Sequence, residues 1–143
     1  MSDLGEPYIP ASESPKELTL RVVVVGIVLG ILMTAANAYL GLYAGMTVSA
    51  SIPAAVMSMI ILRTLFQDVS ILENNAVQTM ASAGESLAAG IIFTVPALLV
   101  IGIWQEIQWL DTMIIALLGG LLGTMFTIAL RRLFIVEEAL PYP

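Results

Sequence analysis

Long stretches without a charged residue divide the chain into segments that are long enough to cross a membrane. An ionised side chain inside hydrocarbon costs several kcal/mol, so charged residues mark where each segment leaves the bilayer. Residues 22–62 carry no charge, and they are about twice the ~20 residues that cross a ~30 Å hydrocarbon core. This stretch predicts a hairpin of two helices, at 22–40 and 46–62, with the fold point at Gly41 and Gly45.

Two further uncharged stretches predict two more helices. One lies between two glutamates and predicts a helix at 86–105, and the other lies between Asp111 and Arg131 and predicts a helix at 112–130. Each is long enough to span the bilayer. The pattern therefore predicts an all-α membrane protein with four transmembrane helices.

A polar segment runs directly into the third of these helices. At about 100° per residue its polar side chains fall within a sector of about 100°, and they are Asn74, Asn75, Gln78, Ser82 and Glu85. A single helix from 74 to 103 would reach ~45 Å, half again the hydrocarbon thickness. We therefore expect either an interfacial helix that lies flat before the third helix or a broken, re-entrant segment, with the weak point at 82–84, which includes Gly84.

Glu85 is the strongest candidate for a functional residue. An ionisable group where a polar stripe meets a membrane segment must be hydrated, paired or protonated, and a proton carrier needs such a setting. We predict a proton-coupling role, against the alternative that Glu85 only caps the third helix at the headgroup level. Asn37, an amide inside the first apolar stretch, is predicted either to contact substrate or to hydrogen-bond between helices.

Glycine and proline residues inside the apolar stretches predict close packing or breaks. Two G-x-x-x-G patterns, in the first and fourth helices, let helix backbones approach closely. Pro53 and Pro96 each free a backbone carbonyl and predict a kink. The hydroxyls of Ser49 and Ser51 precede Pro53, which makes this the more suggestive of the two positions.

Composition excludes most other classes of protein. With 59% hydrophobic residues, 11% charged residues and a mean hydropathy of +0.97, a water-soluble domain is excluded. The chain has no Cys and no His, which excludes thiolate and imidazole nucleophiles and the zinc and haem sites that these residues form. A net charge of -6 argues against nucleic acid. We predict no enzyme, no metal site and no nucleic-acid partner, with a polar cytoplasmic tail at 1–17 and the membrane part at 18–143.

The basic residues predict the orientation. All of the basic residues fall on one side of the four-helix scheme. They are Lys16, Arg21, Arg63, Arg131 and Arg132. Because basic residues collect on the cytoplasmic side of membrane proteins, we predict that both termini and the loop at 63–75 face the cytoplasm.

Several segments of the chain form a recognisable series, which reads AANAYLGL at 35–42, MTVSASIPAA at 46–55, ILENN at 71–75, ASAGESLAAG at 81–90, FTVPA at 93–97 and LPYP at 140–143. Taken together they resemble the oligopeptide transporter family, which includes the yellow-stripe-like metal-chelate carriers, and its prokaryotic branch most of all. The resemblance covers nearly the whole chain after the tail.

This resemblance implies secondary active transport across a prokaryotic cytoplasmic membrane. The implied reaction is symport of small oligopeptides or peptide-like metal chelates, with the proton as coupling ion and no other cofactor. The candidates for lining the substrate cavity are Asn37, Asn74, Asn75, Gln78 and Ser82. Family members are several times longer, with a dozen or more spans, so we expect this chain to be the N-terminal portion and the missing C-terminal helices to be its partners.

Other functions remain alternatives at this point. The four helices could form a scaffold or subunit that transports nothing and only packs against another membrane protein. A four-helix drug exporter would want a carboxylate in its first span, and 22–40 has none. A membrane enzyme is the least favoured, because no nucleophile stands with a base and no metal-ligand cluster exists.

Overall fold

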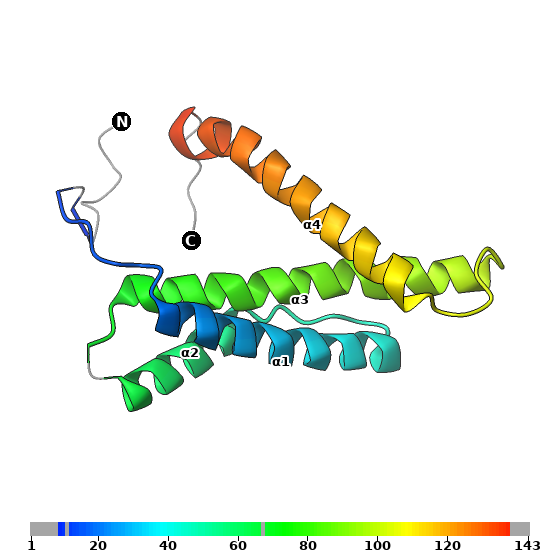
Figure 1. The fold of residues 1–143 in the computed structure, drawn as a ribbon, viewed down its shortest axis with the longest axis horizontal. Coiled ribbons are helices and arrows are strands. Elements are labelled where there is room, and N and C mark those ends of the chain that lie inside the picture. The colour runs from blue at the N-terminus through cyan, green and yellow to red at the C-terminus, as the bar shows by residue number, and fades with distance from the viewer. Residues whose placement is uncertain (1–8, 11, 67, 138–143) are drawn as a thin grey trace. The chain divides into compact units, whose positions relative to one another are not determined.

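In the computed structural model the described part of the chain, residues 9–10, 12–66 and 68–137, contains helices and the segments that join them, and no strand. The helices in order are α1 (Leu20–Ala44), α2 (Ser51–Leu65), α3 (Ile71–Val100), α4 (Trp109–Arg131) and a π-helix that continues α4, η1 (Arg132–Glu137) (Figure 1). The predicted all-α fold with four helices is confirmed. The predicted tail at 1–17 lies partly outside the described residues.

Three of these helices are long and apolar enough to cross a bilayer, and they are Leu20–Ala44, Ile71–Val100 and the continuous stretch Trp109–Ile135. The fourth, α2, has 15 residues, which reach about 22 Å and fall short of a ~30 Å core. Of the predicted second span at 46–62, only the part from Ser51 onward is helical. Pro53 lies in the first turn of α2, where a missing N–H costs no helical hydrogen bond, so the predicted kink is not formed.

The interruption of helical structure lies before α2. Helix α1 continues through Gly41, where the predicted fold segment at 41–45 begins, and ends at Ala44, next to the last residue of that segment. Gly45 has a φ of 69°, a left-handed conformation that glycine adopts without strain, and residues 46–50 have no regular structure. A longer irregular segment thus stands in place of the predicted tight turn.

The predicted break in the third helix is wrong, because α3 is one continuous helix of 30 residues. A glycine inside a helix costs only about 1 kcal/mol relative to alanine. Gly84 does not break α3, and its lack of a side chain lets α1 lie close to it. A Cβ atom at Gly84 would lie 2.8 Å from Thr34 Oγ1 of α1. The polar segment and the third apolar stretch are therefore two halves of the same helix.

Helix α3 ends at Val100, earlier than the predicted end at 105. Gly102 has a φ of 79°, and the Leu98 carbonyl accepts the Ile103 N–H at 3.0 Å, so the chain turns away there. Pro96 lies inside the helix about one turn before this end.

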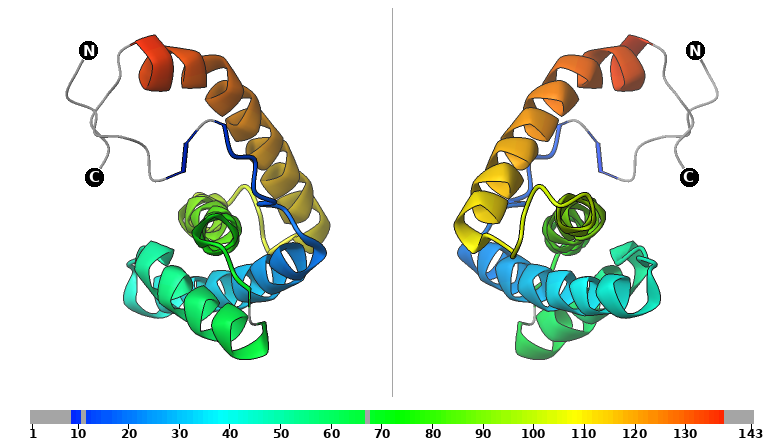
Figure 2. Two further views of the ribbon diagram at one scale, coloured as in Figure 1. Left: turned by 90° about the vertical axis from the view of Figure 1, so that its left-hand side faces the viewer. Right: turned by 90° about the vertical axis from the view of Figure 1, so that its right-hand side faces the viewer.

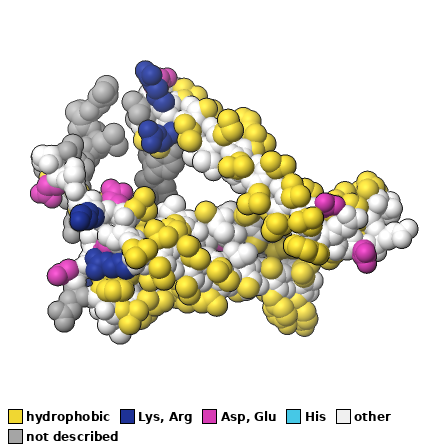
Figure 3. All heavy atoms as spheres, viewed as in Figure 1, with side chains coloured by type: hydrophobic (Ala, Val, Ile, Leu, Met, Phe, Trp, Pro, Cys, Tyr) yellow, Lys and Arg dark blue, Asp and Glu magenta, His cyan; other side chains and the backbone are white. Residues whose placement is uncertain are grey.

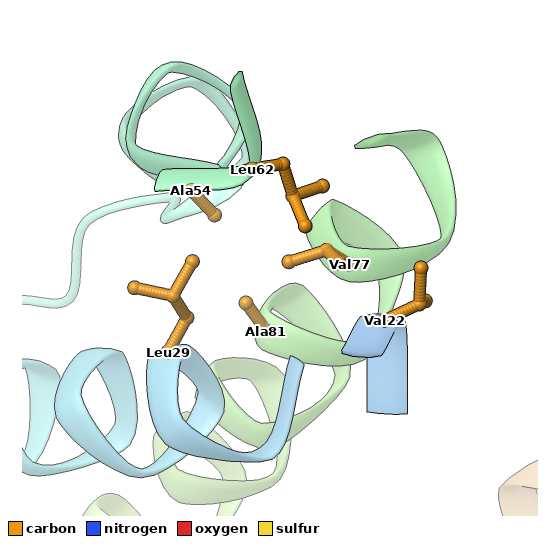
Figure 4. Packing of buried hydrophobic residues seen from close by; sticks show 6 residues of the cluster. All are labelled: Val22, Leu29, Ala54, Leu62, Val77 and Ala81. Carbon is orange, nitrogen blue, oxygen red and sulfur yellow. The ribbon is translucent and has the colours of Figure 1, made fainter. Parts of the chain in front are cut away.

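The chain divides into two compact units, which we describe separately. The first takes the chain up to Ala36 together with Val48–Glu85, and the second takes Asn37–Thr47 together with Ser86–Pro143. In the first unit α1, α2 and α3 enclose a hydrophobic core whose side chains point toward one another in Figure 4, namely Val22, Leu29, Ala54, Leu62, Val77 and Ala81.

Within the first unit α1 and α3 run parallel. Arg21 in the first turn of α1 pairs with Glu73 in the first turn of α3. Further along both helices, a Cβ atom at Gly26 would lie 3.1 Å from the Met80 Cβ. Helix α2 returns in the opposite direction, and Figure 2 shows the three helices of this unit in two further views. Helices α1 and α3 thus point one way and α2 the other.

The second unit has fewer buried side chains. A Cβ atom at Gly41 of α1 would lie 2.9 Å from Ile92 Cγ2 of α3, so these helices touch closely there. No residue of α4 is buried. Figure 3 shows hydrophobic side chains over most of the visible helix surface, which suits contact with lipid or with further helices.

Candidate functional site

A charged cluster surrounds a buried carboxylate at the start of α3. Glu73 is 2% exposed, and its two oxygens accept hydrogen bonds from Arg21 Nε at 2.9 Å and Nη2 at 2.6 Å. Thr19 Oγ1 donates to the same carboxylate at 2.8 Å. The Arg21 guanidinium also donates to the Asp68 carbonyl at 2.6 Å and lies 5.2 Å from the centre of the Phe66 ring. The cluster ties the start of α1 to the start of α3.

Glu73 also caps its own helix. Its backbone N–H donates to Ser70 Oγ at 3.1 Å, and its carboxylate accepts the Ser70 N–H at 3.3 Å. This reciprocal pair is a capping box, and the spacing S-x-x-E at 70–73 is its sequence signal. The sequence analysis did not use that signal and assigned no role to either residue.

The polar stripe of α3 faces α2 at two levels. Ser58 of α2 donates a short hydrogen bond to Asn74 Oδ1. Two helical turns further along α3, the hydroxyls of Ser82 and Ser51 lie 3.2 Å apart. Two members of the predicted stripe, Asn74 and Ser82, thus hold α2 and α3 together.

Four polar side chains form a connected series where α2 begins, and we call them the hydroxyl cluster. Gln78 Nε2 donates to Ser82 Oγ at 3.3 Å, Ser82 bonds to Ser51, and Ser49 Oγ donates to Ser51 Oγ at 3.3 Å. The N-cap residue of α2 is Ala50, which offers no side-chain cap. The hydroxyl cluster therefore places polar side chains beside the junction between the irregular segment at 46–50 and the first turn of α2.

The remaining members of the predicted site are distributed differently. Asn75 is exposed, as is Thr79, whose hydroxyl donates to the Asn75 carbonyl at 2.8 Å. Glu85 and Asn37 are buried, with 7% and 5% of their surface exposed. Glu85 ends the part of α3 that belongs to the first unit, and Asn37 belongs to the second unit. The structure thus bonds Asn74 and Ser82 to α2, links Gln78 to Ser82 within α3, and leaves Asn75 exposed.

Metal binding has no support among the described residues. No group of three or more His, Cys, Asp or Glu side chains lies close enough to hold an ion in that part of the chain. The groups available for chemistry are the amides and hydroxyls of the stripe and the two buried carboxylates of α3.

Comparison with known proteins gives a family for this arrangement. The profile of the family described as OPT oligopeptide transporter protein matches residues 17–143. A Haemophilus influenzae protein named "Putative oligopeptide transporter" is 52% identical over 105 residues, which cover 73% of this chain and 16% of that protein. A Saccharomyces cerevisiae protein of the same description is 28% identical over 156 residues, covering 94% of this chain and 22% of that protein. No solved structure matches.

These matches agree with the resemblance seen in the sequence. The chain spans only 16% and 22% of the lengths of the two relatives, so it corresponds to a part of each. Its apolar helices and its family match together make it an integral membrane protein. The chain belongs to the oligopeptide transporter family.

Proposed function

We propose that this chain forms the N-terminal membrane part of a secondary transporter that carries small oligopeptides by proton symport. The family match supports transport, and the two relatives are named for oligopeptides. The observation that carries the proposal is the irregular segment at 46–50, which leads into the short helix α2 where the hydroxyl cluster lies.

Irregular backbone at membrane depth has a physical cost. Its N–H and C=O groups cannot bond to lipid, so such a segment occurs where protein or a water-filled cavity satisfies it. In secondary transporters, discontinuous helices of this kind form the substrate and ion sites. Residues 46–50 followed by the short helix α2 fit that description better than the continuous α3 does.

The hydroxyl cluster has the chemistry that a peptide needs. A peptide presents amide N–H and C=O groups and two charged ends, and Ser hydroxyls and a Gln amide can donate to or accept from all of them. Gln78 and Ser82 are half-buried, so they are held in position by packing while keeping some access. We assign them, with Ser51, to the wall of the substrate cavity.

Glu85 is the proposed proton carrier. It lies near the middle of a helix of 30 residues and is 7% exposed, which places its carboxyl group far from both helix ends. A buried carboxyl group in an apolar helix is costly unless it is hydrogen-bonded or paired, so such a group is a candidate for a functional role. Uptake and release of one proton there would link the cavity to the proton gradient.

The test replaces the matching segment of the Haemophilus influenzae relative with this chain and reconstitutes the chimera in liposomes. We expect an inward proton gradient to drive accumulation of a labelled tripeptide. Ser82→Ala should raise the KM for the peptide several-fold, since it removes a cavity hydroxyl. Thr79→Ala is the matched control, because Thr79 is exposed on the same helix and its hydroxyl donates to the Asn75 carbonyl of that helix.

The same chimera separates this proposal from the alternatives. A scaffold role would leave the KM unchanged in the Ser82→Ala protein while transport continued. A metal-chelate carrier would accumulate a labelled chelate in place of the tripeptide. The 143-residue chain reconstituted alone shows whether the described helices transport without further spans.

A further inference from the structure

The end of α4 carries an open apolar groove of about 300 Å³. We propose that this groove binds an anionic phospholipid of the surrounding membrane, with the phosphate on Arg131 and an acyl chain along the apolar wall. The groove is lined by Phe126, Thr127, Leu130, Arg131, Phe134 and Ile135. All of these residues come from α4 and η1, so the groove is a property of this one helical stretch.

The shape of the groove follows from the helical repeat. Its lining residues recur at intervals of about four and therefore share one face. Two phenylalanines and two aliphatic side chains form most of the wall, and Phe126 and Ile135 are 60% and 56% exposed. Such a strip of apolar side chains matches an extended hydrocarbon chain in length and polarity.

Arg131 supplies the charge. Arg132 next to it is paired with Glu137 at 3.2 Å, whereas in the described part of the chain no acidic side chain bonds to Arg131. The planar guanidinium donates parallel hydrogen bonds to phosphate oxygens. Figure 3 shows the basic side chains at this end of α4 directly beside hydrophobic ones. This arrangement is complementary to a ligand that has an anionic end and an apolar chain.

The depth of the groove agrees with a lipid. The membrane-length stretch runs from Trp109 to Ile135, so its last turns lie where hydrocarbon gives way to headgroups. Arg131 can extend to the phosphate level while its stem and Phe126 remain among the acyl chains. The basic end of a span faces the leaflet that holds anionic lipids.

A phospholipid also fits better than a protein helix. A protein helix would need to bring a carboxylate to Arg131 at the edge of the hydrocarbon core, where removing that charge from water is costly even when it is paired. One phospholipid molecule supplies both the anion and the apolar chain in the order that the groove presents them. This inference does not depend on transport, so it stands or falls apart from the proposed function.

The experiment uses the full chain in phosphatidylcholine vesicles with a bimane label at Gly123→Cys. The chain has no cysteine of its own, and Gly123 has open space where a Cβ would lie. Gly123 lies on the groove side of α4, one helical turn before the first groove residues, Phe126 and Thr127, and so nearer the membrane centre. Phosphatidylglycerol with brominated acyl chains should quench the label about fivefold more efficiently than brominated phosphatidylcholine at the same mole fraction, the preference expected for one basic residue near an anionic headgroup.

The variants decide whether the groove is responsible. Arg131→Gln should abolish the preference, Arg131→Lys should keep part of it, and Arg63→Gln, a basic residue at the end of α2, should leave it unchanged. Equal quenching by both lipids in the unmodified groove overturns the proposal, and so does a preference that survives Arg131→Gln. Absence of quenching by either lipid also overturns it, because another copy of the chain would then cover this face.

Discussion

Arg21 and Glu73 form a two-point ion pair between the first turns of α1 and α3, with N to O distances of 2.9 Å and 2.6 Å. The pair lies at the edge of the core, and Glu73 is 2% exposed there. Arg21 is only partly exposed, so removing the carboxylate leaves its charge uncompensated at the edge of the core, which destabilises more than the absence of both charges would. The geometry thus makes the start of α3 depend on the start of α1.

The first prediction concerns this ion pair. Glu73→Gln should lower the melting temperature of the chain in detergent on the order of 5 °C, because Arg21 then keeps its charge without a carboxylate. Glu137→Gln is the control, since the Arg132–Glu137 pair is largely exposed and such pairs contribute little. Circular dichroism melts measure both, and equal shifts for the two variants would contradict the assignment.

The sequence could have indicated half of this cluster. The S-x-x-E spacing at 70–73 signals the cap of α3 without any structure. The ion pair with Arg21 could not be predicted from the sequence, because Arg21 lies 52 positions before Glu73 and their contact depends on how α1 and α3 pack. On periodicity alone Arg21 was only a marker of orientation.

The second prediction compares two glycines of α3. Gly84→Ala should destabilise the chain, because the new Cβ would lie 2.8 Å from Thr34 Oγ1, whereas nothing lies within 4 Å of a Cβ at Gly90. Gly90→Ala should stabilise by up to about 1 kcal/mol through helix propensity alone. Thr34→Ala should restore stability to the Gly84→Ala protein, and failure of this rescue would argue against the close approach.

The third prediction tests the parallel packing of α1 and α3 by cross-linking. The Cβ atoms of Gly26→Cys and Met80→Cys would lie about 3.1 Å apart, slightly closer than the mean of about 3.8 Å in disulfides. We expect copper phenanthroline to form this disulfide rapidly. The pair Gly26→Cys with Gly90→Cys is the control, since Gly90 lies about 15 Å further along α3. Faster cross-linking of the control pair would exclude the parallel register.

The fourth prediction concerns the irregular segment before α2. Ser49→Cys should react with a charged aqueous thiol reagent, and substrate peptide should slow the reaction in the liposome chimera. Ile60 lies on the exposed side of α2, facing lipid under this arrangement, and the Ile60→Cys variant should stay unreactive. Protection of both positions would place residues 46–50 in a dry protein interior.

The position of the interruption shows where sequence reasoning reaches its limit. Gly84 looks like a weak point and Pro53 looks like a kink, but a glycine can mark close packing and a proline fits the first turn of a helix. Which meaning applies depends on Thr34, which lies opposite Gly84, and on where α2 begins. The four apolar segments needed no such information, because hydrocarbon length and charge placement define them.

The same limit applies to the polar stripe. Periodicity places Asn74, Gln78 and Ser82 on one face of α3, and this was predicted. That α2 covers this face, with Ser58 and Ser51 as partners, depends on tertiary packing. A polar stripe can bind substrate, join helices or do both, and only the partners show which members are committed to a neighbouring helix.

The last prediction concerns Glu85, which is 7% exposed near the middle of α3. Glu85→Gln keeps the size and a hydrogen-bonding end while removing the exchangeable charge. In the liposome chimera we expect this variant to lose accumulation driven by a proton gradient while counterflow exchange of peptide continues, because exchange needs binding and reorientation without net proton movement. Glu106→Gln, an exposed carboxylate in the connection before α4, should accumulate normally. Full gradient-driven uptake by Glu85→Gln would show that this buried carboxyl group only stabilises the helix packing, and coupling would then belong to the part of the transporter that this chain does not contain.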